Sequence, residues 1–252
     1  MGALRDTYIM AKRSLYHTAK SPDTIVNVAM TPIVLLLLFV YVFGGAFAAD
    51  SPVNYIDFIT PGICVIAVAN GIAFAAVRLN NDLMKGIINR FKTMPIFPSS
   101  ILNGHVVSSL ASNLVSVALV IGAAALFGFR SDASVTAWLA FARLIALFTL
   151  ATSWLAMVFG LLAKTAEGAG AFAYAFLVLL FVSSAFVPTE TMHSSVRGFA
   201  ENQPMTPIVE TLRSLLVNGT PGDSLWVAVA WCVGMLVVGY VGAVMIYRRK
   251  II

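Results

Sequence analysis

The chain has 252 residues, of which 60% are hydrophobic and only 11% are charged, whereas about a quarter of the residues in an average soluble domain are charged. A water-soluble fold of this length cannot hide so much apolar surface, so membrane lipid must be the solvent for much of it. The net charge of +5 does not indicate a nucleic-acid partner, because the basic residues lie in particular connections between apolar segments.

Residues 1–22 are predicted to form an amphipathic helix. The residues at helical spacing on one face are Leu4, Tyr8, Ala11 and Leu15. The basic residues of the segment lie on the other faces. A basic amphipathic helix beside a first membrane span usually lies in the membrane interface. We therefore expect this segment on the membrane surface, before the first span.

Six apolar runs follow, each long enough to supply the roughly 20 residues that a helix needs to cross a bilayer. The runs are continuous, whereas the strands of a membrane barrel would show as alternating segments of about ten residues. The sequence thus predicts an all-α membrane protein with six transmembrane helices in a single domain, residues 1–252. The spans are expected at residues 25–47, 56–77, 101–128, 136–163, 169–187 and 224–247.

A charged stretch, residues 79–98, separates the second and third spans; we call it the coupling segment. Leu83, Ile87, Phe91 and Met94 share one apolar face of a helix roughly three turns long, which Pro95 ends. This stretch is too short to cross a bilayer. Two interpretations are open: a connector on the membrane surface, or a helix that inserts Phe91 and its neighbours into a groove on a cytoplasmic partner.

The longest connection, residues 188–223, joins the fifth and sixth spans. Two stretches in it have helical patterns, 193–201 and 206–216, and Pro207 lies just inside the start of the second. Neither stretch is long enough to span. We expect two short extracellular helices that either form a small cap or re-enter the outer leaflet.

Basic residues are divided unequally between the two sides of this six-span arrangement. The positive-inside rule assigns the basic side to the cytoplasm, and so places both termini there. That side receives twelve of the sixteen basic residues: Arg5, Lys12, Arg13, Lys20, Arg78, Lys85, Arg90, Lys92, Lys164, Arg248, Arg249 and Lys250.

The sequence lacks the motifs that bind nucleotides or metals. The stretch GLLAKT at 160–165 lacks the second glycine and the spacing of a G-x-x-x-x-G-K-[ST] phosphate loop. His17, His105 and His193 are scattered rather than clustered at metal-ligand spacing. Ionisable residues are nearly absent from the spans, with Arg143 the exception, which argues against a proton-driven transporter. We therefore expect no enzyme activity and no cofactor in this chain, and an energy source on another subunit.

The chain carries, in this order, AKRSLYHTAKSPD, YIDFITPGI, KGIINRFKTMPI, ILNGHVVSSL and FVSSAFVPTETM, followed by NQPMTPIVETLRSLLVNG. Each stretch is similar to the corresponding part of ABC-2 family export permeases, particularly those of the daunorubicin-resistance (DrrB-like) type. The resemblance covers nearly the whole chain. One departure is His193, which follows Met192 where the family often has proline.

This resemblance implies the transmembrane subunit of an ATP-binding-cassette exporter that moves an amphipathic drug, antibiotic or lipid out of a bacterial cell. It implies two copies of a separate ATPase subunit, which bind ATP and Mg²⁺, and a second permease copy in a homodimer. It also places the ATPase interface on the lead-in helix and the coupling segment. The docking interpretation is therefore favoured, with these coupling residues: Lys85, Gly86, Arg90, Phe91 and Pro95.

The resemblance further implies a substrate path at the dimer interface, between spans two and five. The residues expected to face it are Asn70, Phe74, Phe172, Phe176 and Phe181. One alternative is a polysaccharide or lipid-linked glycan exporter, which would need more polar and aromatic belts than these spans provide. Another is a non-transporting membrane anchor or sensor for an ATPase.

Replacing Phe91 with alanine should uncouple transport from ATP hydrolysis while the chain still folds in the membrane. The ring shares an apolar face with Leu83 and Ile87, so it needs a surface to bury against. Removing a central aromatic anchor costs roughly 2 kcal/mol or more of docking energy. Co-purification of the ATPase and substrate-stimulated hydrolysis measure the effect. Wild-type values for both would leave the stretch as a connector on the membrane surface.

Overall fold

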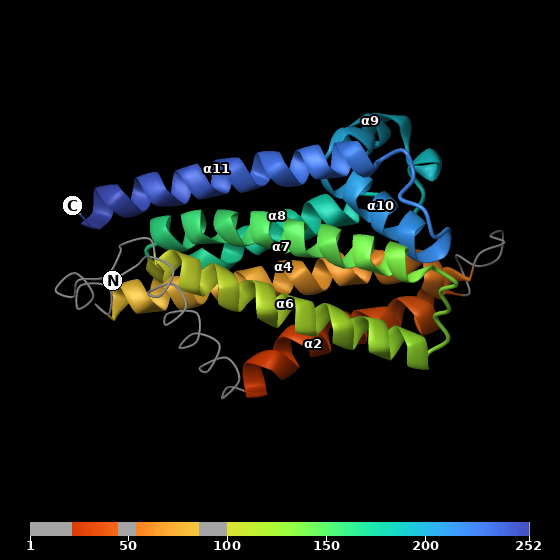
Figure 1. The fold of residues 1–252 in the computed structure, drawn as a ribbon, viewed down its shortest axis with the longest axis horizontal. Helices are drawn as coiled ribbons and strands as arrows, with labels where there is room; N and C mark the ends of the chain where they lie inside the picture. The colour runs from red at the N-terminus through yellow and green to blue at the C-terminus, as the bar shows by residue number, and fades with distance from the viewer. Residues whose placement is uncertain (1–21, 45–53, 86–99, 252) are drawn as a thin grey trace.

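The computed structural model describes residues 22–44, 54–85 and 100–251, which form helices joined by turns (Figure 1). Within these ranges no strand occurs, so the predicted all-α class is confirmed for this part of the chain. The predicted interfacial helix at 1–22 lies outside the described residues, except for Pro22, where helix α2 begins.

The long helices run along the long axis of the molecule, and α2 crosses them obliquely (Figure 1). Helix α2 (Pro22–Leu37) continues as a π-helical turn at Leu38–Phe43. The long helices are α4 (Tyr55–Met84), α6 (Ser100–Leu126), α7 (Val135–Leu162) and α11 (Leu225–Ile251), and the shorter α8 (Ala166–Phe181) lies among them.

Two short helices, α9 (Ser194–Asn202) and α10 (Met205–Val217), gather at one end of the bundle, after a 3-10 turn at Thr189–Thr191 (Figure 1). We call this the α10 end. The opposite end, where α4, α7 and α11 finish, is called the C-terminal end.

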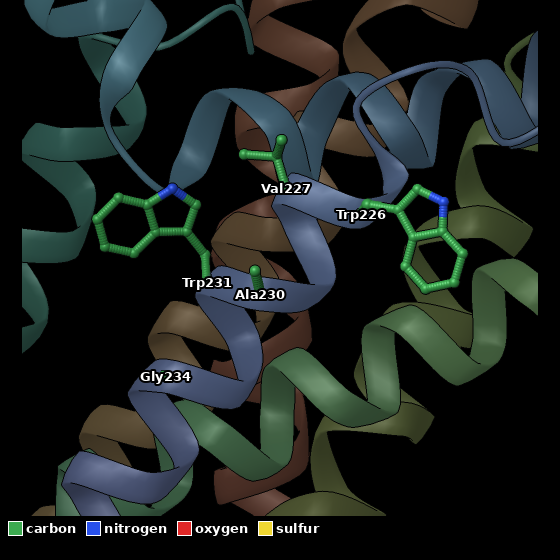
Figure 2. Close-up of a pocket in the computed structure, with 5 residues that line it drawn as sticks. All are labelled: Trp226, Val227, Ala230, Trp231 and Gly234. Carbon is green, nitrogen blue, oxygen red and sulfur yellow. The ribbon is translucent and has the colours of Figure 1, made fainter.

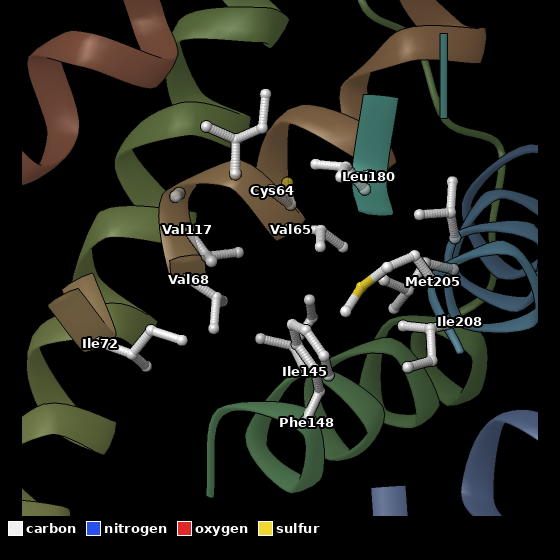
Figure 3. Close-up of a cluster of buried hydrophobic side chains, with 14 of the residues drawn as sticks. Cys64, Val65, Val68, Ile72, Val117, Ile145, Phe148, Leu180, Met205 and Ile208 are labelled. Carbon is white, nitrogen blue, oxygen red and sulfur yellow. The ribbon is translucent and has the colours of Figure 1, made fainter. Parts of the chain in front are cut away.

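Helix α4 is the centre of the bundle. It contacts α2, α6, α7, α8 and α10, and most of its residues are buried. A helix that is apolar on nearly every side is expected in such a position. In Figure 3, Val68 of α4 meets Val117 of α6, Phe148 of α7 and Met205 of α10 in one apolar cluster.

Four of the six predicted spans are helices long and apolar enough to cross a membrane: α4, α6, α7 and Leu225–Lys250 of α11. The first and fifth predicted spans coincide with shorter apolar helices, Ala29–Phe43 and α8. Helix α4 extends past the predicted end of span two at residue 77. It continues to Met84, so the first residues of the coupling segment are its last turns.

Helix α8 ends earlier than the fifth predicted span, 169–187. It stops at Phe181, and its 16 residues correspond to roughly 24 Å, short of the ~30 Å hydrocarbon core of a bilayer. The Ser183 hydroxyl donates to the Leu180 carbonyl (2.6 Å) and accepts from the Ala185 N–H (3.1 Å). This local turn competes with the helix. The apolar residues after it, which extended the predicted span, belong to a buried turn instead.

The two short helices predicted at 193–201 and 206–216 are present as α9 and α10. Helix α10 does not lie on the surface. It packs against α4, α7 and α11, and its buried residues include both faces of the helix. It therefore returns into the bundle, and it brings one charged side chain, Arg213, with it.

Helix α11 lies on the outside of the bundle and is attached mainly along α7. Gly239 allows the two backbones to approach, because a Cβ there would lie 2.8 Å from the Leu155 nitrogen and 3.0 Å from the Trp154 carbonyl carbon. Small residues commonly have this role between membrane helices. Gly234, on the same helix, instead opens onto a shallow apolar hollow (Figure 2), whose other lining residues are Trp226, Val227, Ala230 and Trp231.

The substitution Gly239→Ala should lower the thermal unfolding midpoint of the protein in detergent. Its new methyl group meets backbone atoms of α7, and overpacking of this kind costs roughly 1–3 kcal/mol. Gly234→Ala is the matched control, since no other atom lies within 4 Å of its Cβ position. Alanine is the better helix former by about 1 kcal/mol, so this control should keep or raise the midpoint. Equal midpoints for the two variants would contradict the proposed backbone contact.

Candidate functional site

Of the predicted coupling residues, the structure describes only Lys85. It caps the end of α4, where its N–H donates to the Asn81 carbonyl (3.0 Å), and its side chain is exposed. Gly86, Arg90, Phe91 and Pro95 lie outside the described residues. Their role in docking an ATPase stays a prediction.

Three of the predicted path residues are phenylalanines of α8, the helix that packs beside α4. Phe172 is buried and meets Phe176 edge to face, with 5.8 Å between ring centroids. Phe172 also stacks on Phe159 of α7 at 4.7 Å. Phe181 is 51% exposed and stacks on Phe186 at 4.8 Å. The three rings therefore belong to two separate aromatic groups on α8.

The other two path residues, Asn70 and Phe74, lie about one turn apart on α4. The Asn70 Nδ2 atom is buried and has no hydrogen-bond partner in the described part of the chain. Phe74 is 38% exposed and makes no ring contact with another described residue. A buried amide donor without a partner needs an explanation, such as a water or a ligand.

Three stacked aromatic rings, which the sequence did not reveal, join α8 to the π-helical turn after α2. Phe39, in the π-helical turn after α2, stacks on Phe186 at 4.8 Å, and Phe186 stacks on Phe181 at the same distance. Phe39 is far in sequence from Phe181 and Phe186, so no local pattern could predict its contact with Phe186.

At the α10 end, the Arg213 guanidinium binds the backbone at the point where α8 stops. Its Nε donates to the Phe58 carbonyl (3.0 Å), and its Nη2 donates to the carbonyls of Ser184 (2.6 Å) and Ala185 (3.3 Å). Its Cζ also lies 3.7 Å from the centroid of the Phe58 ring. One side chain thus ties α10 to α4 and to the turn after α8.

These contacts require a charged arginine. Burial lowers the pKa of the Arg213 guanidinium to about 10, and the neighbouring Glu210 carboxylate raises it in part. The group therefore stays protonated at neutral pH and donates from a planar fork that a lysine cannot reproduce. No sequence motif marks Arg213, because its partners become neighbours only in the fold.

Three further hydrogen bonds join the elements of the α10 end. The Gln203 side chain donates to the Leu179 carbonyl of α8 (2.8 Å), and the Ser131 hydroxyl donates to the Leu216 carbonyl at the end of α10 (2.6 Å). The Asp57 carboxylate of α4 accepts from the Arg130 N–H (3.2 Å). The loop between α6 and α7 is thereby joined to both α4 and α10.

At the C-terminal end, polar groups on the last turns of α4 bind two other helices. The Asp82 carboxylate lies 3.3 Å from His105 Nε2 on α6. The Asn80 Nδ2 donates to the carbonyls of Gly160 (3.1 Å) and Ala163 (2.8 Å) at the end of α7. Asn80 and Asp82 lie in the first turn of the coupling segment, and no sequence motif marked them.

Comparison with known proteins identifies the family. The sequence model described as "ABC-2 type transporter" matches residues 5–217. The chain belongs to the ABC-2 type transporter family. This ABC-2 permease is 30% identical over 233 residues to the daunorubicin resistance ABC transporter permease protein DrrB1 of Streptomyces coeruleorubidus. The aligned residues cover 91% of this chain and 81% of DrrB1.

A second relative is the probable doxorubicin resistance ABC transporter permease protein DrrC of Mycobacterium tuberculosis. It is 21% identical over 254 residues, which cover 96% of this chain and 88% of that protein. The resemblance noted from short stretches of the sequence is thus confirmed at the level of the family, and the described site belongs to a permease subunit.

In this ABC-2 permease, Arg213→Ala should markedly lower the thermal unfolding midpoint, because it leaves buried carbonyls without donors at a cost of about 1–3 kcal/mol. Arg213→Lys should lie between Ala and wild type, since it keeps the charge and loses the fork. Arg197→Ala is the control. Arg197 is exposed on α9 and pairs only with Glu201 (2.7 Å) among described carboxylates, and such pairs contribute little. Equal midpoints for Arg213→Ala and Arg197→Ala would contradict the conclusion that Arg213 ties α10 to α4 and to the turn after α8.

Proposed function

We propose that this chain is the transmembrane subunit of an ATP-binding-cassette exporter that moves an amphipathic, drug-like molecule out of a bacterial cell. The observation that carries this proposal is the similarity, over most of the chain, to permeases whose names record resistance to daunorubicin and doxorubicin. The permease would cross the cell membrane six times, with both termini in the cytoplasm and the α10 end outside.

The energy for transport would come from a separate ATPase present in two copies, which binds ATP and Mg²⁺. The absence of a phosphate-loop motif in this sequence supports the proposal that ATP binds to another subunit. The coupling segment would be the docking site, and the described end of α4 supports this because it presents Lys85 at the C-terminal end of the bundle. Two permease copies would form a homodimer.

The substrate path would run beside α4 and α8, at the interface of the two permease copies. Binding sites for drug-sized molecules are mostly apolar, with a few polar groups that fix orientation. Phe74 and Phe181 offer exposed rings, and the Asn70 Nδ2 offers an amide donor. Two exposed rings and one amide donor suit a flat amphipathic molecule, and they are fewer polar and aromatic groups than a sugar chain would need.

Proteoliposomes that contain the permease with its co-purifying ATPase test this function. We expect ATP-dependent movement of daunorubicin across the membrane, and no ATP hydrolysis by the rigorously purified permease alone. Phe181→Ala should weaken transport by removing an exposed ring. A complex that hydrolyses ATP and moves neither daunorubicin nor lipid would instead support the anchor or sensor interpretation, and movement of a lipid-linked glycan would support the glycan exporter.

A further inference from the structure

The C-terminal end of α7 is capped by side chains from two other helices. The last carbonyls of a helix have no partners within it and must find donors elsewhere. The Asn80 Nδ2 of α4 donates to Gly160 (3.1 Å) and Ala163 (2.8 Å), and the Lys250 ammonium of α11 donates to Leu161. Helix α7 thus ends on groups that belong to α4 and α11.

The contact between α4 and α7 at Asn80 is close and buried. Asn80 is 1% exposed, and its Nδ2 is committed to the two carbonyls. Beside it, a Cβ on Gly160 would lie 2.9 Å from the Ala76 carbonyl oxygen. The backbones of α4 and α7 therefore touch at this level, and a displacement of α4 must either carry the end of α7 with it or break the Asn80 bonds.

The end of α7 leads directly into α8. Ala163, which accepts from Asn80, is followed by Lys164 and Thr165, and the Thr165 hydroxyl accepts from the Gly168 N–H (3.1 Å) to begin α8. The first turns of α8 also rest against α4, where a Cβ on Gly170 would lie 3.1 Å from Val77. The position of Ala163 therefore fixes where α8 starts, and α8 carries Phe172 and Phe176.

Asn80 lies in the part of the coupling segment that the end of α4 forms. No break interrupts the helix between Asn80 and its cap at Lys85. A push on the residues after Lys85 would thus reach Asn80 through about one turn of rigid helix.

We propose that Asn80 is a positioning residue that passes movement of the coupling segment from α4 to the start of α8, and this rests on the proposed function as an ATPase-driven permease. Asn80 holds Gly160 and Ala163 to α4, so that α4, the end of α7 and the start of α8 move as one unit. The aromatic groups of α8 then shift together with α4 when the ATPase changes state. A residue that only capped α7 would contribute to stability and leave coupling unchanged.

The test compares the assembled permease–ATPase complex of three variants with the wild type, and measures daunorubicin transported per ATP hydrolysed. Asn80→Ala removes the donors, and Asn80→Asp keeps the shape but presents oxygens to the two carbonyls. We expect both variants to assemble with the ATPase and to hydrolyse ATP. The amount of daunorubicin transported per ATP should fall about tenfold, because the loss of one buried hydrogen bond changes an equilibrium by roughly that factor. Asn202→Ala is the matched control, because its exposed Nδ2 donates within α9, to the Gly198 carbonyl (2.8 Å), at the opposite end of the bundle. It should keep the wild-type ratio.

A distance measurement tests the relay independently of the substrate. Spin labels on Met84→Cys and Glu167→Cys, both exposed positions, report the separation of the end of α4 and the start of α8. With Asn80 present, this distance should be the same without nucleotide and with ATP bound. In Asn80→Ala it should broaden or change when ATP binds.

The outcomes separate this inference from the proposed function. A wild-type complex that hydrolyses ATP without moving daunorubicin counts against the proposed function, and the spin-label distances still test the relay because they need only ATP binding. An Asn80→Ala complex with the wild-type ratio and wild-type distances overturns the relay. A variant that loses hydrolysis and transport in equal proportion also overturns it, since this is the behaviour of a cap that serves stability alone.

Discussion

The short length of α8 determines how the α10 end is built. The last carbonyls of a helix have no partners within it. Where the backbone after the helix is buried, these groups need donors from other parts of the protein. Arg213 provides them for Ser184 and Ala185, and it can do so only because α10 folds back into the bundle. The buried position of α10 thus follows from the early stop of α8.

The two ends of the bundle are held by polar contacts between different helices, whereas the space between α4 and α8 is closed by packing. At the α10 end a charged guanidinium bridges α10, α4 and the turn after α8. At the C-terminal end the neutral amide of Asn80 bridges α4 and α7. Beside these bonds, Gly62 of α4 lies against Ala185 in the turn after α8, and Gly170 of α8 lies against Val77 of α4. Contacts of this kind depend on close van der Waals approach, and they add to the polar contacts that hold α8 beside α4.

Apolar length and helical spacing were enough to predict the helices, because a helix satisfies its own backbone and needs no knowledge of its neighbours. The positions of α4, α6, α7 and α11 followed from this, and Pro207 marked the start of α10. The end of α8 was missed, since Ala185, Phe186 and Val187 extend the apolar run past the turn that Ser183 makes.

The site could be predicted only in part for the same reason. Phe172 and Phe176, which the resemblance placed beside the substrate path, do meet. Arg213 and Asn80 were not chosen, because Arg213 binds Phe58, 155 residues away, and Asn80 binds Gly160, 80 residues away. Such partners are set by how the helices pack, which no local pattern contains. Phe91 and Arg90, which the resemblance singled out, stay predictions because they lie outside the described residues.

The most direct test asks whether the two ends lie on opposite sides of the membrane, with the α10 end outside. Ser195→Cys places a thiol on α9, and Lys164→Cys places one in the turn between α7 and α8; both positions are exposed, whereas the native Cys64 and Cys232 are buried. A membrane-impermeant maleimide applied to intact cells should label Ser195→Cys, and should label Lys164→Cys only after the membrane is permeabilised. The reverse pattern, or labelling of both from outside, would contradict the account.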